Sequence, residues 1–418
     1  MLPNLVFETR PARHPANLLD AAGAGEPLVW LRRGQGFVGL GEAARLDVRG
    51  PGRFAAAEHW WRQILSRASV AGPRLAPGMG PLALGAFTFS PDSPEPSTLV
   101  VPRLVAARFR GQEWVTTATP AGQAALPMPP ACPPRPLPPL TEAPGPVAAA
   151  DWPAVVGRAI GLIESSPLEK VVLARSVVAR AAGPQTIDPR QVLRRLAASY
   201  ADTWTFAVDG LLGATPEILV RSIRGLATSR VLAGTIRRSG SDQDNLARAA
   251  ALARSSKDLE EHEFAVQSVV AALEPFAEEL SVPEVPSVLH LPNVMHLATE
   301  VVGELKRSRS GALPGALALV EALHPSAAVC GTPQREAARG IGQLEGADRG
   351  RYAGPVGWID QDGAGEWGLA LRSAQLNANR TQARLWAGGG IVAASDPLAE
   401  LAETEAKLLP MRQALGLA

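Results

Sequence analysis

Short runs of apolar residues, separated by glycine and polar residues, characterise the first third of the chain. Leu28–Arg32 and Phe37–Leu40 are rich in leucine, β-branched and aromatic side chains, and Arg33–Gly36 between them is typical of a turn. Leu82–Phe89 predicts a further strand, whereas His59–Leu65 is typical of a helix. We therefore expect residues 1–126 to form a β-rich subdomain, and the pattern there indicates no particular chemistry.

The apolar periodicity almost disappears between residues 127 and 150. This stretch contains several Pro-Pro pairs. Proline-dense sequence favours an extended backbone with few internal hydrogen bonds. We therefore interpret residues 127–150 as a linker and residues 151–418 as a second, larger unit.

Helical and strand patterns both occur from residue 151 onward. Trp152–Ile163 has the spacing of an amphipathic helix, and Lys170–Arg180 is a β-branched run that predicts a strand. Thr203–Ala214 predicts a hairpin that turns at Asp209-Gly210. Ser256–Val270 again has helical spacing. This unit is therefore predicted to contain both helices and strands.

Composition and charge argue against several classes of protein. Lys and Arg number 41 against 40 Asp and Glu, so no overall basicity indicates nucleic-acid binding. No uncharged apolar run approaches the ~20 residues that a membrane span needs. Cys132 and Cys330 lie too far apart to indicate a disulfide framework, and the N-terminus lacks a signal-peptide pattern. We expect a soluble cytoplasmic protein that binds neither nucleic acid nor membrane.

Two charged residues lie beside predicted buried strands. Lys170 is at the start of its strand, where a lysine usually reaches toward solvent; it acts as a base only where burial favours the neutral amine. Glu217 comes directly before the apolar run Ile218–Val220. Burying a carboxylate costs several kcal/mol unless it is paired or protonated. Glu217 is therefore a candidate general acid or a member of a structural ion pair.

Glycines and charged residues lie close together near the C-terminus. We expect Gly388–Gly390 to form a loop whose amides can approach an anion, and Ser395–Pro397 to begin a helix. On that helix Glu400, Glu403 and Lys407 share one face. Two carboxylates and an ammonium beside the glycines could hold a metal ion and an anionic ligand. A solvated helix face explains the same pattern.

A second acidic pair lies on the predicted helix 256–270. Asp258 and Glu261 point away from its apolar stripe and are flanked by small residues, so they can approach another element, such as the helix that carries Glu403. Carboxylates from two helices, completed by water, describe a Mg²⁺ site. His262 is adjacent to Glu261, but no second histidine has metal-ligand spacing, which disfavours zinc.

The motifs from Asp151 to the C-terminus, in this order, resemble the chorismate-utilising enzymes: isochorismate, salicylate, anthranilate and aminodeoxychorismate synthases. The resemblance rests on stretches around Lys170, Thr215–Val220, Val231–Thr235, Ser256–His262, Leu291–His296, Leu323–Gly331, Arg351–Pro355, Gly368–Arg372 and Gly388–Lys407. It implies an α+β fold of large, twisted, mostly antiparallel sheets with helices outside. It also implies that residues 151–418 are a chorismate-binding catalytic core with its active site in a cleft.

The resemblance implies a role for each candidate residue. Lys170 would be the general base that activates water, and Glu217 the acid that protonates the departing C4 hydroxyl. Mg²⁺ would be held by Glu261 and Glu403, with Asp258 and Glu400 orienting its waters. The residues that would contact or line the substrate are Gly234, Thr235, His296, Ala328, Tyr352, Arg372, Gly389, Gly390 and Lys407.

Three positions distinguish the branches of this family. Ammonia-using members typically have glutamine where this chain has Lys170, so water is the expected nucleophile here. Aminodeoxychorismate synthases often carry lysine at Ala233, and salicylate synthases tend to carry threonine at Ala328. We therefore expect an isomerase, isochorismate synthase, that needs Mg²⁺ and no obligatory glutaminase subunit.

The alternatives are salicylate synthase, which adds pyruvate elimination, a less favoured anthranilate synthase component I, and a catalytically silent scaffold with the same fold. Menaquinone and siderophore biosynthesis both remain open as destinations of the product.

Overall fold

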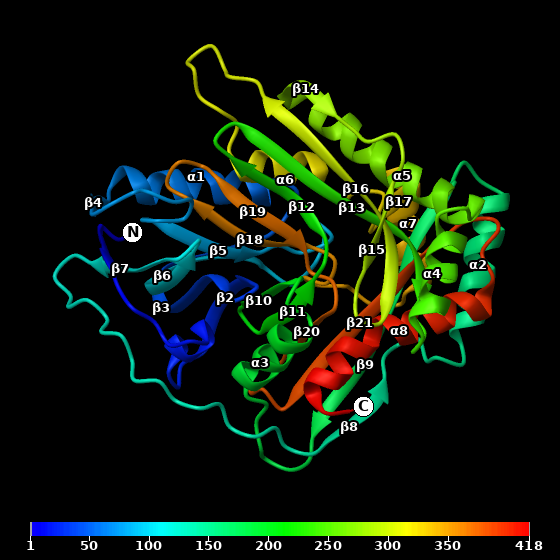
Figure 1. Ribbon diagram of the computed structural model, residues 1–418, viewed down its shortest axis with the longest axis horizontal. Helices are drawn as coiled ribbons and strands as arrows, with labels where there is room; N and C mark the ends of the chain where they lie inside the picture. The colour runs from blue at the N-terminus through cyan, green and yellow to red at the C-terminus, as the bar shows by residue number, and fades with distance from the viewer. Residues whose placement is uncertain (1, 418) are drawn as a thin grey trace.

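The computed structural model describes residues 2–417, in which helices and strands are interspersed along the chain (Figure 1). The helices are α1 (Arg53–Ser66), α2 (Trp152–Glu164), α3 (Pro189–Ser199), α4 (Asp242–Leu252), α5 (Ser256–Leu273), α6 (Ala316–Leu323), α7 (Gln334–Leu344) and α8 (Pro397–Leu415), with short 3-10 helices at Leu18–Ala22 and Glu274–Phe276. Within the described residues, none of the helices combines the length and apolarity needed to cross a membrane.

The strands form one continuous network of paired backbones. In chain order they are β1 (Leu5–Pro11), β2 (Pro27–Arg32), β3 (Gln35–Val48), β4 (Ser69–Ala71), β5 (Leu82–Ala86), β6 (Ser97–Phe109), β7 (Gln112–Pro120), β8 (Leu140–Pro144), β9 (Lys170–Ala181), β10 (Trp204–Val208), β11 (Leu211–Thr215), β12 (Ile218–Ile223), β13 (Leu226–Arg237), β14 (Ala277–Ser281), β15 (Ser287–His290), β16 (Val294–Leu305), β17 (Gly331–Thr332), β18 (Pro355–Asp360), β19 (Gly365–Leu369), β20 (Ser373–Leu376) and β21 (Gln382–Ile391).

Pairing in this network is antiparallel except between β1 and β4. The helices gather outside the strands, with α2, α4, α5, α7 and α8 on one side of the molecule (Figure 1). The expected α+β class with large, mostly antiparallel sheets is confirmed.

Strands of the first third pair directly with strands of the larger unit. β2 pairs with β10, and β5 pairs with β18. The proline-rich segment between β7 and β8 runs along the outside of the molecule (Figure 1) and contains no helix or strand before Leu140. Its end differs from a simple linker, because Leu140–Pro144 forms β8 and pairs with β9. The division at residues 127–150 stays a prediction.

Several local predictions are confirmed at the level of single residues. The β10–β11 hairpin turns at Asp209 and Gly210, both with positive φ, which the side-chain-free glycine and the short polar aspartate tolerate. α8 begins after Asp396, whose side chain accepts the Ala399 amide at 2.7 Å. Ser395 instead bonds Glu400, so the cap is the aspartate.

The loop predicted at Gly388–Gly390 is wrong. Gly388–Gly390 lie inside β21 and pair with Leu173 and its neighbours on β9. Gly234 lies within β13, at a register shift against β16, with φ +74°. At both places the glycines belong to a strand because that strand pairs with a segment far away along the chain. The missing Cβ of each glycine then leaves space beside the strand instead of allowing a turn.

Candidate active site

Lys170 is the first residue of β9, and its side chain is completely buried. Its Nζ donates to the backbone oxygen of Glu261 at 3.3 Å and lies 3.4 Å from Oε1 of the same residue. The lysine side chain points into the protein because residues 170–179 of β9 are all buried. The structure thus brings Lys170 and Glu261 together across 91 residues of sequence.

Glu217 lies between β11 and β12 and is 5% exposed. Burial raises the pKa of its carboxyl to about 8, and the positive charges of Arg372 and Lys170 offset this effect only in part. The carboxyl is therefore mainly protonated at neutral pH, the state that a general acid requires.

Three glutamates from two helices converge on the glycines of β21. A Cβ at Gly389 would lie 2.9 Å from Glu400 Oε2 and 3.4 Å from Glu403 Oε1. A Cβ at Gly390 would collide with Glu261 Oε1. The missing side chains of these glycines therefore make the space in which the carboxylates from α5 and α8 meet.

Glu400 is the most enclosed of the three glutamates, at 2% exposed. Its Oε1 accepts from Lys257 Nζ at 2.8 Å and from Ser395 Oγ at 2.9 Å, while its Oε2 is buried without a protein partner. Burial, together with the negative charge of Glu403, raises the pKa of Glu400 to about 7 despite the adjacent Lys257. Its unpartnered oxygen points toward Gly389.

These residues fit a hard cation of the Mg²⁺ type. Within residues 2–417 no group of three or more His, Cys, Asp or Glu side chains already has the spacing of a metal centre. However, a site with two protein carboxylates, completed by water and ligand oxygens, does not require one. Glu261 and Glu403 come from facing helices, and the unpaired Oε2 of Glu400 offers an acceptor for a metal-bound water.

Lys407, on the same helix, lies at the other side of Glu403. Its Nζ forms an ion pair with Glu403 and donates to the backbone oxygen of Gly388 at 2.9 Å. The i, i+4 spacing expected from the sequence is therefore a real pair, but it faces the cavity rather than solvent.

His296, Arg372 and Thr235 form a buried hydrogen-bonded chain. Arg372 Nη2 lies 3.2 Å from His296 Nε2, and His296 Nδ1 lies 3.1 Å from Thr235 Oγ1 and 3.3 Å from the oxygen of Gly234. A guanidinium can only donate, so Nε2 accepts and the proton of the neutral ring is on Nδ1. Burial and the charge of Arg372 also lower the pKa of His296 well below its usual value.

Tyr352 and Ala328 line other parts of the same cavity. The Tyr352 ring stacks on Trp386 with centroids 5.6 Å apart, and burial raises the pKa of its hydroxyl to about 12, so the phenol keeps its proton. The predicted residues that line the cavity are Glu217, Gly234, Thr235, Glu261, His296, Ala328, Tyr352, Arg372, Gly389, Gly390 and Lys407. Lys170 joins them through Glu261, Asp258 packs against Gly234, and Glu400 and Glu403 lie over Gly389.

Sequence reasoning missed three residues of this site. Lys257 precedes Asp258 on α5, and its spacing to Glu261 favours a pair within the helix, yet it reaches Glu400 on α8. Trp386 supports the Tyr352 ring, and buried Arg349 lines the cavity while it donates to the oxygens of Val172 and Val329. Only the position of Arg349, three residues before the predicted Tyr352, could have indicated its involvement.

A larger cavity of about 480 Å³ lies elsewhere, among β2, β10, β12 and β13. Glu366 there accepts the indole N–H groups of Trp30 and Trp204 at 2.7 and 2.8 Å, and Glu300 pairs with Arg230. These carboxylates already have partners, whereas Glu400 keeps one buried oxygen without a protein partner. We therefore place the chemistry in the narrower cavity.

Comparison with known proteins identifies the family of this chain. Residues 10–127 and 133–416 match the family model described as chorismate binding enzyme. A Mycobacterium tuberculosis protein described as putative isochorismate synthase MenF is 38% identical over 355 residues, which cover 82% of this chain and 88% of the relative. A salicylate biosynthesis isochorismate synthase from Pseudomonas aeruginosa is 36% identical over 417 residues, with 93% and 84% covered.

Solved structures show the same fold. A putative 2,3-dihydroxybenzoate-specific isochorismate synthase from Bacillus anthracis aligns with a TM-score of 0.76 and 32% identity, covering 94% of this chain and 97% of the other. The menaquinone-specific isochorismate synthase of Escherichia coli aligns with a TM-score of 0.80 at 24% identity, covering 99% and 95%, and supports the fold alone. The family match spans nearly the whole chain, and the relatives agree with it over most of their own length. This chain belongs to the chorismate-binding enzyme family.

Proposed function

We propose that this protein is an isochorismate synthase, an isomerase that converts chorismate to isochorismate. Water adds at C2, the C4 hydroxyl leaves as water, and the ring double bonds shift, so substrate and product have the same composition. The observation that carries the proposal is the position of two buried residues: protonated Glu217 lines the cavity, and Lys170 contacts Glu261 in the cavity wall. The relatives named isochorismate synthase support the same reaction.

Lys170 is the proposed base. Its side chain is completely buried, beside the residues that line the cavity. The contact with Glu261 holds the amine at the cavity wall. Transfer of the proton to Nζ generates the nucleophile as it attacks C2.

Glu217 is the proposed acid. Its carboxyl is protonated at neutral pH and can donate that proton to the departing C4 hydroxyl. Glu217 then ends the step as a carboxylate near the positive charges of Lys170 and Arg372, which stabilise it. Proton exchange with solvent would restore both groups for the next turnover.

Mg²⁺ is the proposed cofactor, held by Glu261 and Glu403 with Glu400 and Asp258 orienting its waters. The cation would offset the charge of a substrate carboxylate. One side of β21 pairs with β9 as far as Ile391, whereas the other side pairs with β20 only as far as Leu385. Between Leu385 and Ile391, every second backbone amide points to this other side and has no strand partner there. These amides near Gly389 and Gly390, with Lys407, form an anion-binding edge.

Tyr352 and Arg372 would hold a carboxylate of the substrate. The protonated phenol can donate a hydrogen bond, and the guanidinium has donors left after its bond to His296. Gly234 and Thr235 fix His296 behind Arg372 and so keep the guanidinium in one orientation.

Salicylate synthase is the second candidate, since it makes the same intermediate before pyruvate elimination. Ala328 favours the first candidate, because a methyl group at the cavity wall neither hydrogen-bonds the intermediate nor presses it into a folded geometry. Anthranilate synthase component I is disfavoured by Lys170, which suits water rather than ammonia, and no glutaminase partner is then required.

The deciding experiment is chromatography of chorismate after incubation with the protein and Mg²⁺. Isochorismate is the expected product. Salicylate as the main product would support the second candidate, anthranilate formed with ammonium salts the third, and unchanged chorismate would contradict an enzymatic role.

A further inference from the structure

Residues 349–354 carry Arg349 and Tyr352 into the active-site cavity. One side of this loop is held by the catalytic core: Ala353 N donates to Ala370 O at 3.1 Å, and Ala370 N donates to Gly354 O at 2.8 Å. The stacking of Tyr352 on Trp386 holds the same side. These contacts come from strands close to the active site.

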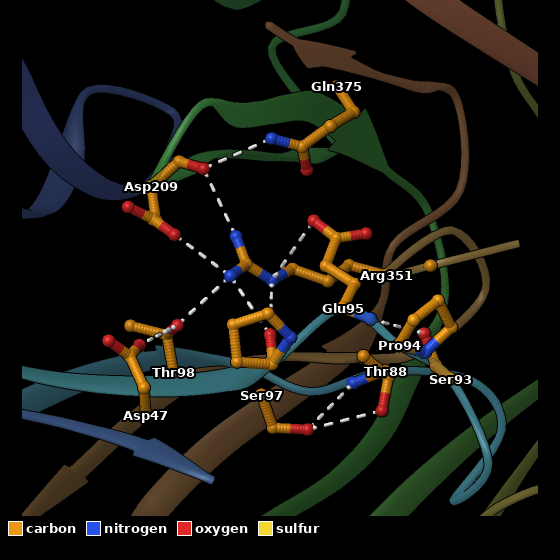
Figure 2. Close-up of polar contacts among 12 residues, drawn as sticks. Asp47, Thr88, Ser93, Pro94, Glu95, Ser97, Thr98, Asp209, Arg351 and Gln375 are labelled. Carbon is orange, nitrogen blue, oxygen red and sulfur yellow. Dashed lines mark hydrogen bonds and ion pairs between the residues drawn. The ribbon is translucent and has the colours of Figure 1, made fainter. Parts of the chain in front are cut away.

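Arg351 anchors the other side of the loop (Figure 2). Its Nε and Nη2 donate to Pro96 O at 3.0 and 2.9 Å, and Nη2 also donates to Thr98 Oγ1 at 3.0 Å. Nη1 donates to Asp209 O at 3.1 Å, and Nη2 lies 2.8 Å from Asp209 Oδ2. All three guanidinium nitrogens are therefore used, and they join the start of β6, the β10–β11 turn and the loop.

The first third of the chain holds the loop at two more points. Phe89 N donates to Gly350 O at 2.8 Å, and Ser93 Oγ donates to Asp348 Oδ2 at 2.7 Å. Residues 87–98 thus follow the loop along its length. Glu95, in the same segment, has Oε1 3.7 Å from Nε of Arg351, whereas the second charged partner of Arg351, Asp209, belongs to the larger unit.

The geometry of the attachment favours arginine specifically. The planar guanidinium bonds two backbone oxygens, a hydroxyl and a carboxylate at once, which the single ammonium of a lysine cannot reproduce. Arg351 is 3% exposed, so these contacts form away from water and are costly to lose. These contacts fix the backbone at Arg351 and therefore also the backbone position of the adjacent residue, Tyr352.

We propose that Arg351 is a positioning residue through which the first third of the chain, together with the β10–β11 turn, sets the orientation of Tyr352 in the active site. The contribution of Tyr352 to substrate binding rests on the proposed function. The attachment of the loop by Arg351 is a structural statement and can be tested without turnover.

The kinetic test is a double-mutant cycle of Arg351→Gln and Tyr352→Phe on chorismate. Arg351→Gln should raise KM about tenfold through misplacement of a binding group, and kcat less. In the Tyr352→Phe background the same change should alter KM by less than about twofold, because the hydroxyl it positions is gone. Equal effects in both backgrounds would overturn the proposal.

Arg45→Gln is the matched control. Arg45 also pairs with Asp209, at 3.0 Å, and with Asp47, but it has no contact with the loop. Its loss removes the same charge from the same network and should leave KM unchanged. A rise in KM equal to that of Arg351→Gln would show a general effect of the network and contradict a specific role for Arg351.

Hydrogen–deuterium exchange supplies the readout that needs no activity. Amides 350–354 should exchange faster in Arg351→Gln than in wild type or Arg45→Gln, and Arg351→Lys should restore protection in part. The milder lysine variant also keeps the test decisive if the glutamine variant fails to fold. Unchanged exchange in both Arg351 variants would overturn the proposal, whereas faster exchange with no KM effect of Tyr352→Phe would count against the role given to Tyr352 in the proposed function.

Discussion

Two regions of this molecule have opposite effects on their carboxylates: the network around Arg351, which holds the half-buried Asp209, and the active-site cavity, which holds the buried Glu217 and Glu400. Around Arg351, Asp209 accepts bonds from two arginines, and their bonds and charges outweigh its burial and keep its pKa below the usual value. In the active-site cavity, burial dominates for Glu217, whose pKa rises to about 8, and Glu400 keeps one oxygen without a protein partner.

This difference distinguishes carboxylates that stabilise the fold from carboxylates that are available for the reaction. An unpartnered buried polar group costs stability, so a fold retains one where a ligand or a reaction uses it. A fully bonded network instead stabilises one arrangement of the backbone. We therefore expect changes in the cavity to reduce catalysis with little loss of stability, and changes outside it to do the reverse.

Loss of the metal should have the largest effect. Chelation by EDTA, or Glu403→Gln, should lower activity at least about 10³-fold, because several kcal/mol of charge stabilisation disappears. Calorimetric titration with Mg²⁺ should show weak binding to wild type and none to the variant. The control is Glu405→Gln on the same helix, where the glutamate pairs with Arg412 and Arg175 outside the cavity. Full activity in EDTA would contradict the metal assignment.

Loss of either proton-transfer group should have the second-largest effect on activity. Glu217→Gln and Lys170→Ala should each lower kcat by about 10²–10⁴-fold, with a smaller change in KM. Steady-state kinetics on purified, folded variants measures this, with the surface change Glu142→Gln as control. A loss below about tenfold for Lys170→Ala would make the lysine structural.

The pH dependence should reveal Glu217 in both rate and stability. With a pKa of about 8 the acid form is lost at higher pH, so kcat should fall above about pH 8. The folded pKa lies above the ordinary carboxyl value of 4.5, so the native state binds an extra proton between these two values, and stability declines as pH rises from about 4.5 to about 8. Thermal unfolding of Glu217→Gln should show a smaller decline over the same range; parallel curves would refute the shift.

A change in the cavity wall should have a smaller effect. Ala328→Thr adds a hydroxyl and bulk beside the bound intermediate, and we expect a measurable rise in salicylate. Fluorescence of the product from wild type and variant on chorismate is the measurement. If the wild type already makes mainly salicylate, the assignment passes to salicylate synthase.

The smallest effect is expected at the surface. Arg412 pairs with Glu142 and Glu405. Since such pairs are screened by water, Arg412→Gln should reduce the free energy of unfolding by less than about 1 kcal/mol and leave kcat unchanged. A larger loss in thermal unfolding would show that this pair belongs with the scaffold network rather than with ordinary surface charges.

Much of the site was predictable because its residues occur in local motifs. The strand that begins at Lys170, the hairpin at Asp209-Gly210 and the cap at Asp396 follow from side-chain types and spacing. The roles proposed for Lys170 and Glu217 came from the resemblance and stay predictions, although the structure buries both side chains and places Glu217 in the cavity and Lys170 against Glu261 in its wall.

The sequence by itself determined that a strand begins at Lys170, that a helix begins at Ser256 and which of their side chains share a face, because these properties depend on neighbours within a few residues. Only the tertiary structure decided that Gly388–Gly390 join a strand, that Lys257 pairs with Glu400, and that Arg351 joins the first third to the active-site loop. Each depends on a partner far away along the chain. Local spacing limits the directions a side chain can take, but the packing of distant elements selects what it meets.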